Sequence, residues 1–133
     1  MSQSLKPSYE VKVIKPLVAK IVINDEIVFI RVFPIPAHVK VQEDGFVVSV
    51  TATLTVESNK PKMGFPCNMI GSSTPVVPSN IEFIDEGVVI IQAGSKEITV
   101  KPKITSVFVY PGFRDDLGYP CVRVSWISLT NVK

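Results

Sequence analysis

Alternating apolar and polar side chains between Phe46 and Val56 predict a β-strand with one buried face. Every second residue from Phe46 onward is apolar, and most residues between them are serine or threonine. A period of two places successive side chains on opposite faces of a strand. Asp44-Gly45 comes just before this stretch and is a typical two-residue hairpin turn. We therefore expect a second strand to end at Glu43 and to pair antiparallel with this one.

The two-residue turn also predicts a register for this hairpin. A shift by one residue would bring Lys40 and His38 onto the apolar face, which disfavours the alternative. The predicted partners on the apolar face are Val41 and Val48, Val39 and Val50, Ala37 and Ala52, and Ile35 and Leu54.

Apolar runs between turn residues and prolines predict about ten short strands, and no stretch of similar length has a helical period. Such a series is typical of a sandwich or barrel. We predict a single all-β domain over residues 1–133, a mainly antiparallel β-sandwich of about 8–10 strands, with a small closed or partly open β-barrel as the alternative. The expected strands are 9–14, 17–23, 27–33, 37–43, 46–56, 81–84, 88–92, 96–101, 104–110 and 121–129.

A three-stranded meander is expected between Ile81 and Lys101. The first turn, Asp85-Glu86-Gly87, fits a three-residue loop with its glycine in the left-handed conformation. The second turn, Gly94-Ser95, fits a two-residue hairpin. The predicted partners are Ile81 and Ile91, Phe83 and Val89, Ile91 and Ile98, and Val89 and Val100.

Two expected strands, around residues 27–30 and 88–91, are apolar on both faces. Such strands are typically covered by a second layer or by another subunit. In the second strand Ile90 would point outward beside Thr99 and Glu82, which makes it a candidate interface residue, an ordinary surface hydrophobe being the alternative. The mean hydropathy of +0.32 is high, and self-association into a homo-oligomer would cover the excess apolar surface.

The composition supports the all-β prediction and narrows the class of partner. Val, Ile and Thr make up about a third of the 133 residues, and these β-branched side chains suit a pleated sheet. The net charge of +2 is scattered along the chain, whereas nucleic-acid binders gather basic residues on one face. No apolar run approaches the roughly 18–20 residues that cross a bilayer. The first ten residues also lack the layout of a signal peptide.

We therefore expect a soluble cytoplasmic protein that has no membrane partner. The chain contains few Gln and Cys residues and many Ile, Val and Lys residues. This composition follows a trend of proteins from thermophiles.

Two long irregular segments, Glu57 to Asn80 and Pro111 to Pro120, share a short motif. Met-Gly-Phe-Pro-Cys at 63–67 recurs as Leu-Gly-Tyr-Pro-Cys at 117–121, through either a duplicated unit or chance. Long loops in compact domains are uncommon and often functional. The candidate ligand or partner residues in them are Lys60, Lys62, Phe65, Phe113, Arg114, Asp115, Asp116 and Tyr119.

The only two cysteines, Cys67 and Cys121, occupy equivalent positions in these motifs. The favoured interpretation is two separate buried thiols that act as small hydrophobes. The second is a disulfide that closes a loop of about 55 residues, worth about 4 kcal/mol by the loop-entropy model. The third, catalytic or redox thiols, is disfavoured because no base or helix N-terminus that would lower a thiol pKa is evident.

Few residues offer catalytic or metal-binding chemistry. His38 is the single histidine, so with the two cysteines it could at best approach the three ligands that a metal site needs. A Ser-His-Asp triad would have to use His38, and no serine lies in a nucleophile elbow. The acidic pairs sit in tight turns, where carboxylates commonly bond the local backbone. Asp115-Asp116 is the one pair kept as a candidate for acid–base chemistry. We assign no catalytic residue, metal or cofactor, and we favour a protein that is not an enzyme.

The leading hypothesis is a non-catalytic binding or assembly module that self-associates and uses an exposed apolar strand or the loop 57–80. One alternative is a small enzyme or accessory subunit with a site near Cys67 and Cys121. A second alternative is a single-stranded nucleic-acid binder, in which loop lysines flank stacking aromatic residues. The sequence identifies no small-molecule ligand.

Overall fold

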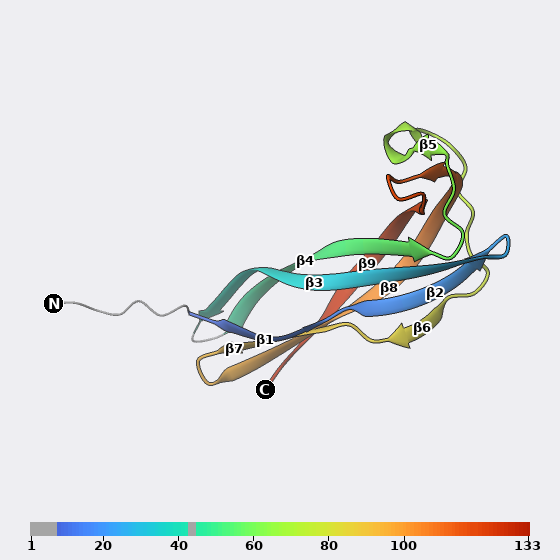
Figure 1. Cartoon of the computed structure of the whole chain (residues 1–133). Coiled ribbons are helices and arrows are strands. Elements are labelled where there is room, and N and C mark those ends of the chain that lie inside the picture. The colour runs from blue at the N-terminus through green and yellow to red at the C-terminus, as the bar shows by residue number, and fades with distance from the viewer. Residues whose placement is uncertain (1–7, 43–44) are drawn as a thin grey trace.

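The computed structural model describes residues 8–42 and 45–133, and it consists of two mainly antiparallel sheets (Figure 1). The predicted all-β, sandwich-like fold is confirmed, and the sheets do not close into a barrel. The β8 sheet contains β1 (Glu10–Lys15), β7 (Val88–Ala93), β8 (Lys96–Arg114), β9 (Pro120–Val132) and the two-residue β5 (Phe65–Pro66). The β3 sheet contains β4 (Gly45–Ser58), β3 (Glu26–Gln42), β2 (Leu17–Ile23) and β6 (Glu82–Asp85). A short 3-10 turn, η1 (Cys67–Met69), follows β5.

A two-stranded ribbon joins the sheets at one side of the sandwich. β1 pairs with β7 in the β8 sheet, and their continuations β2 and β6 pair in the β3 sheet. The ribbon turns this corner at Pro16 and Gly87, as strands do when they pass from one sheet to another. A Cβ on the buried Gly87 would lie 2.7 Å from the backbone nitrogen of Leu17, so the corner requires glycine.

Because of this corner, the first half of the meander predicted between Ile81 and Lys101 is wrong and the second half is confirmed. Phe83 lies opposite Ala19 of β2, because β6 belongs to the other sheet and does not pair with β7. Gly87 has no positive φ, since it lies at a corner and not in a hairpin. The Gly94-Ser95 hairpin is confirmed with its predicted pairs, Ile91 with Ile98 and Val89 with Val100.

The predicted hairpin between β3 and β4 forms, but its register is wrong by two residues. Val41 lies opposite Phe46, and Val39 opposite Val48. A shift of two keeps each side chain on its predicted face, which is why the alternation pattern could not exclude it. The predicted pairing of Glu43 with Phe46, and the Asp44 half of the turn, lie outside the described residues.

An irregularity in β3 between Pro36 and His38 changes the register again. Ile35 consequently lies opposite Thr51 and not opposite Leu54, and Pro34, not Ala37, is the partner of Ala52. Such a bulge adds a residue to one strand of a pair and cannot be seen in the alternation of its partner.

β3 and β8 continue through prolines that were expected to end them. β2 ends opposite Val32, so β3 has only β4 as a neighbour at Pro34 and Pro36. The pairing of β7 ends opposite Val100, so β8 has only β9 as a neighbour at Pro102. A strand with one free side accommodates the missing N–H of proline.

The space between the sheets is filled by two apolar clusters. One is formed by Leu17, Ala19, Ile21, Ile23, Val28, Ile30, Val32, Val107 and Val109. The other is formed by Val89, Ile91, Ala93, Ile98 and Val100, and Val39, Val48 and Val50 pack against it. We call these two clusters and the strands around them the body of the molecule.

Candidate functional site

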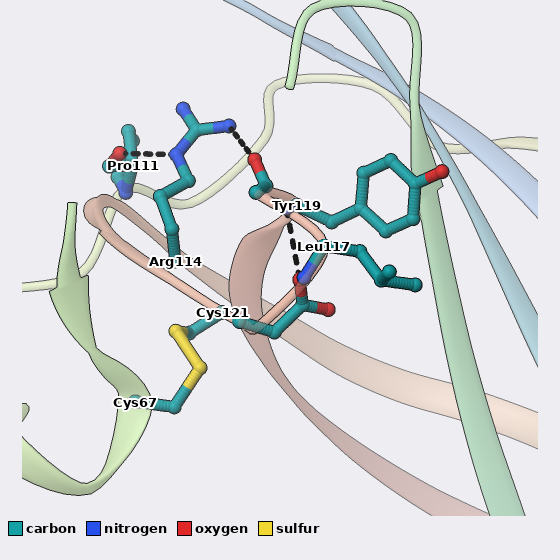
Figure 2. Close-up of a disulfide and its surroundings, with 8 residues drawn as sticks. Cys67, Pro111, Arg114, Leu117, Tyr119 and Cys121 are labelled. Carbon is teal, nitrogen blue, oxygen red and sulfur yellow. Dashed lines mark hydrogen bonds between the residues drawn. A yellow bond between two sulfur atoms is a disulfide. The ribbon is translucent and has the colours of Figure 1, made fainter. Parts of the chain in front are cut away.

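The two long loops meet beyond the ends of β4 and β8, at the end of the molecule where Figure 1 draws β5. We call this region, residues 59–73 and 110–121, the tip. A disulfide between Cys67 and Cys121 crosslinks it, with a Cα–Cα distance of 5.7 Å (Figure 2). The favoured sequence interpretation, two separate thiols, is therefore corrected in favour of the second one. The cysteines are close because β5 runs parallel to the end of β8 while β9 begins on the other side of β8.

The recurring motif has a physical explanation in the packing of its two glycines. A Cβ on Gly118, whose φ is +85°, would lie 3.0 Å from the backbone nitrogen and oxygen of Lys62. A Cβ on Gly64 would lie 2.7 Å from Cγ of Arg114. Each glycine thus permits one loop to approach the other, and the amide of Lys62 donates to the carbonyl of Gly118 at 3.0 Å.

A buried ion pair fixes the tip to the β3 sheet. The two terminal nitrogens of Arg114 donate to the two carboxylate oxygens of Glu26 at 2.7 and 2.9 Å. The side chains are 1% and 7% exposed. The hydroxyl of Ser58 donates to the same carboxylate and accepts a hydrogen bond from the amide of Lys60. Bidentate pairs of this kind are the strongest that an arginine makes.

Arg114 also supports the loop that follows it. Its Nε donates to the carbonyl of Pro111 at 2.9 Å, and a terminal nitrogen donates to the carbonyl of Gly118 at 3.3 Å (Figure 2). The sequence predicts Arg114 as a ligand- or partner-contacting residue, but its guanidinium is bonded to groups inside the protein. The hydrogen bonds of Arg114 and then Ser58 hold the pKa of the Glu26 carboxyl below its ordinary value of 4.5, although burial opposes this.

The tip exposes several large apolar side chains beside its charged ones. Met63 is 98% exposed and Leu117 is 71% exposed, which makes them the two most exposed large apolar side chains of the described residues. Phe65 and Met69 are exposed as well. The Phe65 ring rests on Phe113 with a centroid distance of 6.0 Å.

An open depression of about 430 Å³ lies between the two loops, lined by Lys62, Met63, Asp115, Asp116 and Leu117 together with Pro61, Gly64 and Gly118. One carboxylate oxygen of Asp115 accepts from the amides of Leu117 and Tyr119, both at 2.9 Å. This is the ordinary role of an aspartate in a turn. Asp116 is exposed, as are Lys60 and Lys62. The two acids and Lys62 therefore share one rim, while the sulfur atoms do not line the depression.

Several predicted residues lie away from the tip. Ile90 is half-buried in β7 between Val13 of β1 and Thr99 of β8, and not beside Glu82, which is in the other sheet. His38 is exposed in β3. Within residues 8–42 and 45–133, no group of three or more His, Cys, Asp or Glu side chains is arranged to hold a metal.

Sequence reasoning missed the contributions of Glu26, Ser58, Met63 and Leu117. Glu26 follows a turn and has no distinguishing local pattern, and its partner is 88 positions away in sequence. The exposure of Met63 and Leu117 depends on the same long-range packing.

The fold and the tip define an all-β, sandwich-like protein with a crosslinked loop end. Comparison with protein-family models, curated proteins and solved structures finds no match to this chain. Among the described residues, no helix has the length and apolar character that crossing a bilayer requires.

Proposed function

We propose that this protein is a non-catalytic binding module whose contact surface is the tip. The single observation that carries the proposal is the exposure of Met63 and Leu117 on a segment that a disulfide and a buried ion pair hold in place. Exposed apolar side chains that gather on one surface are typical of sites that bind other proteins.

The crosslinks favour binding because they lower its entropic cost. A loop that is already ordered loses little conformational freedom when a partner covers it. The depression between Lys62 and Leu117 would accept one apolar side chain of the partner, and the charges at its rim would contact polar groups around it. We infer a protein partner that presents a protruding apolar residue.

The other two functions remain weaker candidates at the same place. An enzyme would need an available nucleophile or base, whereas Asp115 is engaged by two backbone amides and the cysteines are joined. A nucleic-acid binder would use Lys60, Lys62 and Phe65, but the carboxylates of Asp115 and Asp116 would repel phosphates from the depression.

A cytoplasmic, thermophilic origin belongs to the same proposal. Disulfides are rare in the cytosol of mesophiles but ordinary in intracellular proteins of hyperthermophiles. The Cys67–Cys121 crosslink is thus compatible with a cytoplasmic location in such an organism. Self-association, which the apolar composition also favours, concerns a different surface of the molecule.

The test compares tip variants with matched surface variants in affinity capture from a lysate of the source organism. Met63→Ser with Leu117→Ser removes the exposed apolar surface and should abolish retention of the partner. Ile14→Ser with Val22→Ser changes two exposed apolar residues of β1 and β2 and should leave retention intact. Titration with the purified partner should then give at least a tenfold weaker affinity for the tip variant.

The proposal fails if the tip variant retains the same proteins as the unaltered chain. It also fails if no protein is retained by the unaltered chain and lost by the tip variant. Retention of oligonucleotides that is lost at high salt would instead support the nucleic-acid alternative.

A further inference from the structure

Among the described residues, five strands have an outer edge that is not paired in the sheets: β1, β9 and the two-residue β5 in one sheet, and β4 and β6 in the other. Natural proteins protect such edges with charges, prolines, bulges or short strands. β1 carries Lys12 and Lys15 and has an irregular register. β6 has four residues, two of which are acidic. The two edges at the corner side are therefore protected.

β4 lacks each of these protections. From Gly45 to Val56 it contains no charged residue and no proline, and its own register has no inserted residue. It is also long, and its outer-face threonines are exposed. β9 contacts β4 across the side of the sandwich opposite the corner, which we call the open side. The edge of β9 is less protected than those of β1 and β6 but more protected than that of β4, because its first half contains Arg123. The longest unprotected edge of the described residues is thus β4.

We propose that β4 pairs antiparallel with β4 of a second copy of this chain, which makes the open side of the sandwich a self-association surface. An unpaired edge presents backbone N–H and C=O groups at alternate residues, and an extended strand is the occupant that satisfies them all. This inference goes beyond the proposed function, because it uses a surface on another part of the molecule.

Charge and symmetry favour a second copy in the antiparallel direction. Glu57 is the one charged residue of β4, and a parallel pair in register would place two of these carboxylates side by side. An antiparallel pair about a two-fold axis near Ala52 places Glu57 of one copy opposite the uncharged Val47 of the other. The same axis sets Val50 of one copy opposite Leu54 of the other, and the apolar side chain of Leu54 is exposed in the single chain. A two-fold contact of this kind closes on itself and stops at a dimer.

The test is the molar mass of the intact protein by light scattering across a dilution series. The unaltered chain should be a dimer that dissociates on dilution. Thr51→Lys with Thr53→Lys places four lysines around the two-fold axis and should raise the dimer dissociation constant at least tenfold. Ser128→Lys with Thr130→Lys, a matched change of two exposed positions in β9, should have little effect. Circular dichroism of each variant checks that it remains folded.

Hydrogen exchange gives a second measurement that does not need a variant. Amides of residues 47–55 that point away from β3 should exchange faster as the protein is diluted. A monomer at every concentration would overturn the inference, as would an unchanged dimer in the Thr51→Lys, Thr53→Lys variant. Dissociation by the β9 change alone would also overturn it and would assign the interface to β9. The tip variant Met63→Ser, Leu117→Ser should keep the dimer, so failure at the tip and failure here are distinguishable.

Discussion

The body and the tip of this molecule are held together by different interactions. In the body, side chains such as Ile30 and Val109 are fully buried between two sheets, and the contacts are almost entirely apolar. At the tip the buried apolar cluster consists of Ile70, Tyr110 and Cys121 alone, with three half-buried neighbours. A disulfide and a bidentate ion pair stand beside this small cluster.

The difference shows what a loop region needs if it is to expose apolar side chains and remain ordered. Burial of apolar area stabilises the body in proportion to the area removed from water. The tip directs Met63 and Leu117 outward, so these side chains contribute little burial to its stability. Crosslinks between distant parts of the chain replace that contribution.

Among the variants that separate the tip from the body, removal of Arg114 should cause the largest loss in the free energy of unfolding. Arg114→Ala leaves the Glu26 carboxylate buried without its partner, and breaking a buried pair in this way costs about 3–5 kcal/mol. The free energy of unfolding from urea titration measures the loss. Arg31→Ala, which breaks an exposed pair with Glu57 at 3.8 Å, should cost less than about 1 kcal/mol.

The double variant Glu26→Leu with Arg114→Met sharpens the result. If the penalty of Arg114→Ala comes from an unpaired charge, replacing both partners by apolar residues should recover much of the lost stability. An equal loss in the Arg114→Ala and Arg31→Ala variants would contradict a special role for the buried pair.

Removing the disulfide should have the next largest effect. Cys67 and Cys121 are 54 positions apart, and the loop-entropy model gives at most about 4 kcal/mol for such a crosslink. Cys67→Ala with Cys121→Ala should lower the free energy of unfolding by about 2–4 kcal/mol. The amides of Lys62 and Gly118 should exchange faster, while those of Val89 and Ile91 in the body keep their relative protection.

A reducing dithiol supplies the control for this variant. It should destabilise the unaltered protein by a similar amount and leave the alanine variant unchanged. The idea that the crosslink orders the tip fails if tip exchange is the same with and without the disulfide.

The strand pattern of the body could be predicted from sequence, because alternation is a local property. The period of two between Phe46 and Val56 and the Gly94-Ser95 turn both led to strands that the structure contains. The prolines led to wrong strand ends at Pro34 and Pro102. A proline within a strand costs little where the strand has a neighbour on only one side, and the sequence does not show where a neighbouring strand ends. The corner at Gly87 was missed because a glycine in close packing and a glycine in a turn look the same in sequence.

The tip could be located but not explained from sequence. The length of the loops and the repeated motif indicated the region, and the disulfide between Cys67 and Cys121 was among the interpretations considered. The ion pair could not be predicted, because Glu26 follows an ordinary turn and Arg114 lies at the far end of another strand. Long-range pairs of this kind depend on how the two sheets pack, and no local pattern encodes that packing.

Acid should weaken the tip through Glu26, and this is the smallest effect that we predict. The pKa of Glu26 is lowered in the folded state, so its contribution to stability is present above its ordinary value of 4.5. That contribution is lost as the pH falls through the lower, folded-state pKa. Between pH 6 and pH 3 the unaltered protein should therefore lose more free energy of unfolding than Glu26→Gln does.

Glu86 provides the matched comparison on the surface. Lys103 and then Lys101 lower the pKa of its carboxyl, but this group is exposed and its ion pairs are screened by salt. The pH-dependent difference between the unaltered protein and Glu86→Gln should shrink in roughly 1 M salt, where the Debye length is about 3 Å. The difference for Glu26→Gln should persist, because the buried pair with Arg114 is screened much less. If salt removes both differences equally, the Glu26 carboxylate reaches solvent and the tip is not fixed as the structure describes.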